Sequence, residues 1–292
     1  MSTLILDGKK IANDVLQSVQ AEGDELAKKT GRAISLVIIS VGEREDSKKY
    51  INSKLKKAQS LGFSARNVCL NENTTQIELE NTIQALSIDN EVDGIILQLP
   101  IALDSNRAIE KIDPKKDIDG LHPKNQVALI SRKDGLFPCT PLGIIHLIKE
   151  ARSILVNSSD LSALNVVVVG RSELVGRPVA QMLINENCTV TVCHSKTNNL
   201  NLHTKSADIL VSATGFAGLV SEVKEGAILI DVGLNYDSKV VRGDIDFNAV
   251  LPICAAITPV PGGVGPMTVA MLMKNLVKAK SLQLAYAHNP LK

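Results

Sequence analysis

Lys54 follows Tyr50 by four residues, and this pair is the first place in the chain where side-chain types and spacing suggest chemistry. In a helix, side chains four positions apart share one face, so the phenol and the amine would be neighbours. A lysine held in this way can move protons to and from a substrate. Further lysines flank the pair, and a solvated basic face would explain them without any function.

Gln98 and Asp119 are polar residues at informative positions. Gln98 lies near the C-terminal end of a mostly apolar run, residues 92–99, where an amide is costly unless it is hydrogen-bonded to a loop or a ligand. Ligands of open α/β sheets bind at that end of the strands. Asp119 precedes Gly120, so it is either a turn former or a carboxylate that accepts two parallel N–H bonds from a ligand. His122 stands before a proline and is expected to be structural.

A turn from Gly170 to Gly176 follows the apolar run 165–169 and could hold a phosphate at a helix N-terminus. The spacing differs from the G-x-G-x-x-G fingerprint, so a plain strand-to-helix turn stays open. After the next strand no acid stands where NAD enzymes place one for the ribose hydroxyls. Ser195 can donate a hydrogen bond there, and Arg171 and Lys196 can add positive charge. This favours NADP over NAD, unless Lys196 is simply solvated.

Residues 258–268 hold three glycines and three prolines. This composition predicts a stiff loop that a ligand can approach closely, and the loop is expected to lead into a helix starting at Thr268. Functional residues are common on such loops.

The apolar pattern predicts the frame for these residues. In the first half, helices are expected at residues 8–29, 43–58 and 76–88, and strands at 33–41, 66–70 and 92–99. In the second half, strands are expected at 165–169, 189–193, 207–213 and 227–232, and helices at 142–151, 178–185 and 268–281. The proline-rich segment 113–141 between the halves is read as a loop-rich junction. The alternation is typical of α/β folds with mostly parallel sheets.

Length and composition narrow the function. The 292 residues suggest two domains, although their number also fits one large α/β domain. A net charge of +1, 2% aromatic residues and no Trp argue against nucleic acid or a membrane surface as partner. The apolar runs are too short to span a bilayer, and no signal peptide is visible. The five cysteines form no C-x-x-C pair, so no metal site is expected, and a reducing cytoplasm is the expected location.

Taken together and in order, these segments resemble the methylenetetrahydrofolate dehydrogenase/cyclohydrolase family over essentially the whole chain. The matching pieces are residues 50–54, 94–100, 116–122, 138–141, 169–178, 193–195, 226–235, 243–247 and 258–268. The resemblance implies an N-terminal α/β folate and catalytic domain (residues 1–140 plus 268–292), a Rossmann-like NADP-binding domain (141–267) and a cleft between them. It also implies a homodimer. The implied reactions are NADP-dependent oxidation of 5,10-methylenetetrahydrofolate to the methenyl compound, then hydrolysis to 10-formyltetrahydrofolate.

The resemblance also assigns roles. Tyr50 would stack on the aminobenzoate of the folate, Lys54 would transfer protons, Gln98 would hydrogen-bond Lys54, and Asp119 would hold the pterin. Other substrate contacts would come from residues beside these strands and loops: Leu97, Leu99, Pro261, Gly262, Gly263, Val264 and Gly265. The cofactor would be bound by Gly170, Arg171, Ser172, Ser195 and Leu234.

Some residues depart from the family pattern. Glu45-Asp46 stand where Pro-Ala is usual, Ile101-Ala102 where a second proline follows, Leu121 where phenylalanine is usual, and Phe216-Ala217 where a proline is common. Three alternatives stay open: a dehydrogenase without hydrolase activity, a non-catalytic nucleotide sensor, and a short-chain alcohol dehydrogenase. Chain order argues against a short-chain alcohol dehydrogenase. In that family the glycine-rich turn precedes the catalytic tyrosine, whereas here Gly170 follows Tyr50.

Overall fold

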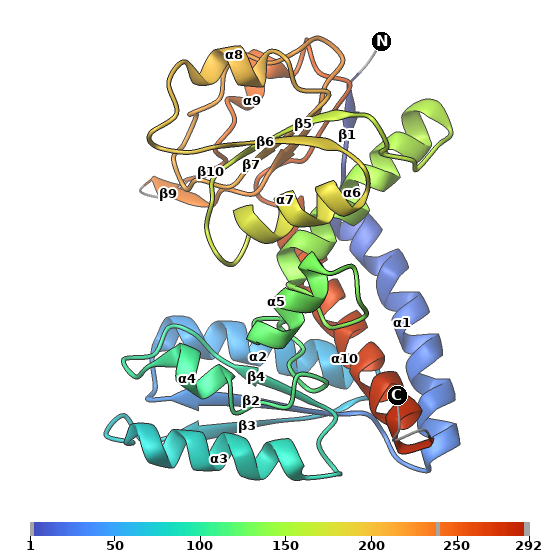
Figure 1. Cartoon of the computed structure of the whole chain (residues 1–292), viewed down its shortest axis with the longest axis vertical. Coiled ribbons are helices and arrows are strands. Elements are labelled where there is room, and N and C mark those ends of the chain that lie inside the picture. Colours follow the sequence, from blue (N-terminus) through green and yellow to red (C-terminus); the bar gives the residue numbers. More distant parts are fainter. Residues whose placement is uncertain (1–2, 238–239, 289–292) are drawn as a thin grey trace. The chain divides into compact units, whose positions relative to one another are not determined.

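Alternating apolar strands and amphipathic helices build two separate parallel β-sheets (Figure 1). The computed structural model describes residues 3–237 and 240–288. These residues divide into two units: one holds the residues up to Asn13 together with Pro138–Met271, the other holds Asp14–Phe137 and the residues from Leu272 onward. The expected first domain, 1–140 plus 268–292, differs from this at its start. The reason is that the first strand pairs with a strand of the other unit.

The unit built around Asp14–Phe137 has a three-stranded sheet in the order β3 (Ser64–Leu70), β2 (Ser35–Val41), β4 (Gly94–Leu97), and every pair is parallel. Its central strand is buried except at the two ends, which is typical of a strand covered on both faces. Two helices connect the strands, α2 (Glu45–Ser60) and α3 (Gln76–Ile88). A capping box between Thr75 and Glu78 fixes the start of α3.

The strand order creates a switch point in this sheet. The chain goes from β2 to β3 on one side and then crosses to β4 on the other side. The loops after β2 and β4 therefore diverge, and such a crevice at the carboxyl ends of the strands is where open α/β sheets bind ligands. Strand β4 ends at Leu97, so Gln98 is the first residue beyond it.

The expected loop-rich junction, residues 113–141, is partly wrong, because it contains the helix α5 (Pro123–Ile130). Pro123 lies in the first turn, where a backbone N–H has no partner within the helix, so the proline costs nothing there. The Nδ1 of His122 accepts a hydrogen bond from the Lys124 N–H at 3.0 Å and caps the helix. This is the structural role expected for His122. A short helix, α4 (Ser105–Ile109), was also not predicted.

Two long helices are α1 (Gly8–Thr30) and α10 (Val264–His288). The apolar positions Val15 and Val19 of α1 are buried, as its spacing predicts. Helix α10 begins four residues before the expected Thr268, so Val264 and Gly265 are helical and only the start of the stiff segment is a loop. Pro266 does not prevent this, because it lies in the first turn.

The other unit contains a six-stranded sheet in which all pairs are parallel. Its order is β1 (Leu4–Ile5), β11 (Ala256–Ile257), β8 (Ile228–Asp231), β7 (Ile209–Ser212), β5 (Asn165–Val169) and β6 (Thr189–Cys193). The other elements of this unit are α6 (Cys139–Val156), α7 (Gly176–Asn185), α8 (Leu200–Thr204), α9 (Phe247–Val250) and the hairpin of β9 (Asn235–Asp237) with β10 (Val240–Arg242).

This larger sheet also has a switch point, between β5 and β7. The chain runs from β5 to its neighbour β6 and then crosses back to β7 on the other side of β5. Gly170 and Ala213 directly follow these two strands, and the Ala213 N–H donates to the Val169 carbonyl at 2.8 Å. In the part of the chain that the structure describes, no helix is both long and apolar enough to cross a bilayer.

Candidate active site

Lys54 and Gln98 come together at the switch point of the three-stranded sheet. The Nζ of Lys54, on α2, donates a hydrogen bond to the Oε1 of Gln98 at 3.2 Å. The Nε2 of Gln98 donates to the Leu99 carbonyl at 2.8 Å. That second bond fixes the amide orientation, because only the oxygen is then left to face the ammonium. Both side chains are half-buried, so the amine is held in place and remains within reach of a substrate.

The other predicted substrate residues around this pair differ in exposure. Tyr50 lies one turn before Lys54 on the same helix, and 58% of it is exposed, which leaves its ring able to lie against a ligand. Leu97 is buried in the hydrophobic core of the unit, and Leu99 packs against that core. Their side chains are therefore occupied by packing, and they can offer a ligand mainly backbone groups.

Asp119 provides the negative charge of the site. Burial raises the pKa of its carboxyl group above the ordinary value, and the positive charge of Lys54 acts in the opposite direction. Burial, the larger effect, favours the neutral carboxyl, and the ammonium of Lys54 offsets part of that rise in favour of the ionised form, which can accept two N–H bonds. The structure brings Lys54 into contact with Gln98 and into electrostatic range of Asp119.

A buried carboxylate holds the loop that carries Asp119. The Oδ2 of Asp117 accepts hydrogen bonds from the His122 N–H at 2.7 Å and from the Asn125 Nδ2 at 2.9 Å. Burial raises the pKa of Asp117 to about 6, against these hydrogen bonds. From α10, the Nδ2 of Asn275 donates to the Ile118 carbonyl at 2.8 Å. Asp119 therefore projects from a segment anchored on both sides, and Asp117 and Asn275 were not predicted from the sequence.

The predicted phosphate turn lies at the switch point of the six-stranded sheet. Gly170 has a φ of +117°, and a Cβ placed on it would lie 2.3 Å from the Ala213 carbonyl oxygen. Only glycine fits this turn without displacement of the backbone. The Oγ of Ser172 accepts from the Val175 N–H at 3.3 Å and the Gly176 N–H at 3.2 Å, so Ser172 shapes the start of α7. The turn matches the close backbone approach that a dinucleotide phosphate needs.

Arg171 and Ser195 follow neighbouring strands, β5 and β6, and both are exposed. The ends of these strands are joined, because the Gly170 N–H donates to the Cys193 carbonyl at 2.9 Å. Beyond Cys193 the chain turns sharply, with the His194 N–H bonded to the Thr197 Oγ1 at 2.9 Å. An exposed hydroxyl and an exposed guanidinium thus lie at one sheet edge, where they could bind a ribose phosphate.

The remaining predicted residues belong to this same unit. Leu234 is 51% exposed and follows β8. Residues 261–265 continue from β11 into the first turn of α10, and the Gly263 N–H closes the turn on the Pro259 carbonyl at 2.9 Å. The predicted substrate residues thus come from both units: Pro261 to Gly265 from one, and Tyr50, Lys54, Gln98 and Asp119 from the other.

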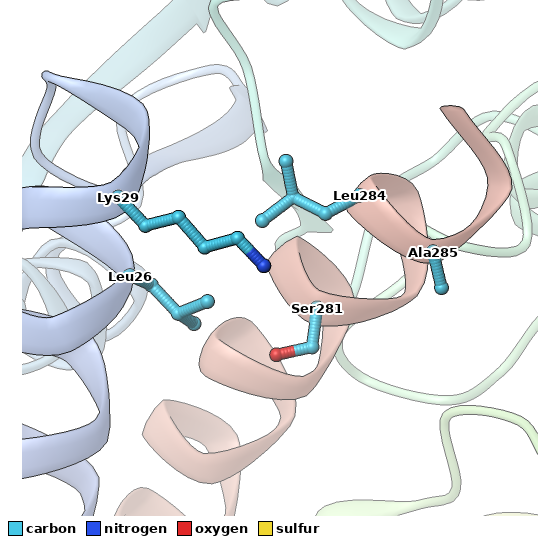
Figure 2. A pocket seen from close by; sticks show the side chains of 5 residues that line it. All are labelled: Leu26, Lys29, Ser281, Leu284 and Ala285. Atoms are coloured by element: carbon cyan, nitrogen blue, oxygen red, sulfur yellow. The ribbon is translucent and has the colours of Figure 1, made fainter. Parts of the chain in front are cut away.

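A hollow elsewhere in the molecule has none of these features. It has a volume of about 260 Å³ and lies between the ends of α1 and α10 (Figure 2). Its lining residues are Leu26, Lys29, Ser281, Leu284 and Ala285. Only the Lys29 side chain, which extends from α1 toward α10 in Figure 2, carries a charge. This lining contains no carboxylate or imidazole that could work with the lysine as an acid or base.

Comparisons with known proteins identify the family of this chain. Residues 6–119 match the family model of the tetrahydrofolate dehydrogenase/cyclohydrolase catalytic domain, and residues 138–284 match its NAD(P)-binding domain. A relative from Campylobacter concisus, named bifunctional protein FolD, is 44% identical, over 96% of this chain and 99% of its own length. The Bacillus subtilis protein of the same name is 42% identical, over 96% and 98%.

Solved structures give the same result. The crystal structure of the bifunctional FolD dehydrogenase/cyclohydrolase from Campylobacter jejuni has a TM-score of 0.91 and 40% identity, covering 97% of this chain and 100% of that one. The Trypanosoma brucei dehydrogenase-cyclohydrolase, solved with NADP and an inhibitor, has a TM-score of 0.88 and 36% identity, covering 97% and 99%. With a catalytic and an NAD(P)-binding domain both matched, the chain belongs to the tetrahydrofolate dehydrogenase/cyclohydrolase family.

Proposed function

We propose that this chain oxidises 5,10-methylenetetrahydrofolate to 5,10-methenyltetrahydrofolate with NADP and then hydrolyses the product to 10-formyltetrahydrofolate. The observation that carries the proposal is the Lys54 ammonium, bonded to Gln98 at 3.2 Å and electrostatically coupled to Asp119 at one sheet edge. This arrangement supplies a proton-transfer group and a carboxylate for the pterin within a single site.

The oxidation step asks little of the side chains. The reacting carbon lies between two nitrogens, so loss of hydride leaves a delocalised cation and no strong base is needed. NADP, when bound, accepts that hydride. The residues of this chain contribute by position: Asp119 holds the pterin by its amino and ring N–H groups, and Tyr50 lies against the aminobenzoate. Fixing the two reactants in this way removes the entropic part of the barrier.

The hydrolysis step needs proton transfer. Water adds to the methenyl carbon and loses one proton. The bond from that carbon to one ring nitrogen then breaks as the nitrogen gains a proton, and the remaining hydroxyl loses its proton to become the formyl C=O. Lys54 can accept the first proton and donate the second. Gln98 keeps the amine directed at one place, because the Gln98 amide is itself fixed by the Leu99 carbonyl. The net change is addition of one water to the methenyl cation, opening of the ring and release of one proton.

The residues that would hold NADP are Gly170, Arg171, Ser172, Ser195 and Leu234. The close contact that only glycine permits at Gly170 supports a phosphate there. The absence of an acid after β6 leaves room for a 2′-phosphate beside Ser195 and Arg171. Residues 261–265 would form one wall of the folate site. We propose that the folate and cofactor functions divide between the two units with the boundaries that the structure gives.

One experiment tests both reactions. Purified protein is mixed with methylenetetrahydrofolate and either NADP or NAD, and absorbance spectra are recorded over time. In parallel, hydrolysis of the methenyl compound is followed without any cofactor. We expect reduced cofactor to form with NADP, and the methenyl band to decay faster than in buffer. Oxidation without hydrolysis would leave a dehydrogenase only. Binding of NADP with no turnover would support a sensor, and turnover with NAD alone would overturn the cofactor assignment.

Two further proposals concern the state of the protein in the cell. The resemblance to the family suggests a homodimer, which light scattering tests against the monomer mass of 31.3 kDa. All five cysteines are free thiols, which suits a reducing cytoplasm, and fractionation of cells would test this location.

A further inference from the structure

Asp244 is fully buried in the unit with the six-stranded sheet, and its carboxylate collects hydrogen bonds from one loop. It accepts from three consecutive backbone N–H groups, those of Thr214 at 2.6 Å, Gly215 at 3.3 Å and Phe216 at 3.1 Å. These residues follow β7 directly. The same carboxylate also accepts from the Asn235 Nδ2 at 3.1 Å, which ties the loop after β8 to the loop after β7.

A second buried carboxylate, Asp231, supports the first. Its Oδ1 accepts from the Asp244 N–H at 2.9 Å and the Gly233 N–H at 3.2 Å, and its Oδ2 accepts from the Ile245 N–H at 2.9 Å. Its own N–H donates to the Thr258 Oγ1 at 2.8 Å, at the start of the stiff segment. Among the described residues, neither carboxylate forms an ion pair with a Lys, Arg or His side chain. Hydrogen bonds alone therefore stabilise both charges.

Two glycines make room for this cluster. A Cβ on Gly233 would lie 1.8 Å from an Asp244 oxygen, and a Cβ on Gly243 would lie 1.9 Å from an Asp231 oxygen. Each carboxylate thus packs directly against the backbone of the segment that carries the other. A carboxylate can do this because it only accepts hydrogen bonds, whereas an amide would turn an N–H group toward these donors.

The cluster lies at the functional edge of the sheet. The loop it holds after β7 starts beside Gly170, because Ala213 faces that glycine. The loop it holds after β8 carries Leu234. In a dinucleotide-binding sheet the two halves of the cofactor lie on the two sides of the switch point. With Ser195 on the β6 side, the loops after β7 and β8 would face the half that carries the nicotinamide.

We propose that Asp244, supported by Asp231, is a positioning residue that sets the loops after β7 and β8 for the nicotinamide half of NADP. This inference rests on the proposed use of NADP. Neither carboxylate is placed in contact with the cofactor. They act through the backbone of residues 214–216 and 233–235.

Two ligands separate this role from a merely structural one. The dissociation constants of NADP and of 2′,5′-ADP, which lacks the nicotinamide half, are measured by calorimetry for the wild type and Asp244→Asn. We expect NADP affinity to fall about 10- to 100-fold, the size of one or two lost charge-assisted hydrogen bonds. Affinity for 2′,5′-ADP stays within about twofold, and so does the rate of cofactor-free hydrolysis of the methenyl compound.

Asp208→Asn is the matched control. The Oδ2 of Asp208 accepts from the Asn165 N–H at 2.9 Å, at the opposite edge of the same sheet. This variant should bind both ligands as the wild type does. If Asp244→Asn lost affinity equally for both ligands, or lost no affinity for NADP, the inference would be overturned. The proposed function would stand in that case, provided that the wild type turns over NADP. A wild type that binds no NADP overturns the proposed cofactor and this inference with it. If Asp244→Asn does not fold, Ser212→Ala and Asp231→Asn are judged by the same ratio, because Ser212 donates to Asp244 at 3.3 Å.

Discussion

The two sheets share a strand order around their switch points but use different parts of the chain at the ligand edge. In the three-stranded sheet the edge presents side chains, with Lys54 and Gln98 in contact and Asp119 nearby. In the six-stranded sheet the edge presents mainly backbone, with Gly170 against Ala213. Proton transfer needs titratable side chains, whereas a phosphate is bound well by N–H groups. The same topology thus supports two tasks.

Both edges nevertheless depend on buried carboxylates that touch loops rather than ligands. Asp117 holds the segment that presents Asp119, and Asp231 with Asp244 holds the loops after β7 and β8. Burial raises the pKa to about 6 for Asp117 and for Asp231. Burying these carboxylates costs free energy, but their hydrogen bonds fix the irregular backbone beside each binding site.

The comparison predicts its largest effect for Lys54→Met. Hydrolysis of the methenyl compound should fall about 10²- to 10⁴-fold, the usual contribution of a general acid or base. NADP binding should be unchanged, because the cofactor residues belong to the other sheet. A stopped assay of hydrolysis and a calorimetric titration with NADP measure the two effects. Lys56→Met, an exposed lysine on the same helix, is the control. Normal hydrolysis in the Lys54 variant would remove this residue from its role.

Gly170→Ala should show the reverse pattern. The added Cβ meets the Ala213 carbonyl, so the turn must move, and we expect NADP affinity to fall at least about tenfold with hydrolysis retained. Gly226→Ala is the control, since Gly226 has a φ of +75° but open space around it. The control variant isolates the conformational strain, about 1–2 kcal/mol of stability. Loss of hydrolysis in Gly170→Ala would contradict the separation of the two edges.

Ser195→Asp tests the cofactor choice within the backbone-dominated edge. An acid after β6 would repel a 2′-phosphate and accept hydrogen bonds from ribose hydroxyls. We expect the ratio of kcat/KM for NADP over NAD to drop about tenfold or more, while hydrolysis is unaffected. Steady-state rates with both cofactors provide the ratio. A ratio equal to that of the wild type would place the 2′-phosphate away from Ser195.

The smallest effect concerns stability and pH. A carboxyl whose pKa is near 6 when folded and near 3.8 when unfolded binds more protons in the folded state between these values. Its contribution to the free energy of unfolding therefore decreases as pH rises through that window. The stability advantage of wild type over Asp117→Asn, and over Asp231→Asn, should shrink by about 2 kcal/mol from pH 4.5 to 8. Urea unfolding at both pH values measures it.

Asp208→Asn should behave in the opposite way. Burial alone would raise the pKa of Asp208, but hydrogen bonds from Lys224 and Asn165 outweigh it and the pKa is lowered. The advantage of wild type over this variant should therefore grow from acid to alkaline pH. If the stability advantage of the wild type changed with pH in the same direction for all three variants, the pKa shifts of these carboxyl groups would not be the cause.

Most of the frame follows from the sequence, because continuous apolar runs such as residues 165–169 can only be buried strands between helices. The two-residue strands β1 and β11 are too short for any periodic signal, and their pairing is set by tertiary contact. The sequence predicts a loop in place of helix α5, because Pro123 and the nearby charges are typical of a turn. The start of α10 was placed four residues late for the same reason, as Gly265 and Pro266 lie in its first turn.

The site was predictable to a different degree. The place of Gln98 after a strand follows from its sequence, but its contact with Lys54 joins residues that no local pattern connects. The buried carboxylates Asp117, Asp231 and Asp244 were missed, because an isolated aspartate in a strand or loop has no spacing rule. The sequence holds a weak signal for two of them. Gly233, two residues after Asp231, makes room for Asp244, and Gly243, next to Asp244, makes room for Asp231.

The short strand β1 also constrains the order of events during synthesis. Leu4 and Ile5 are synthesised about 250 residues before their partners Ala256 and Ile257, so this strand pair forms only after most of its unit has been made. The Oγ1 of Thr3 likewise bonds the carbonyls of Leu251 and Cys254. The unit with the three-stranded sheet likewise includes the part of helix α10 from Leu272 onward, which is made long after the strands of that sheet. Both units therefore need residues beyond position 255, and a product terminated before Ala256 would lack the β1–β11 pair of one unit and helix α10 of the other.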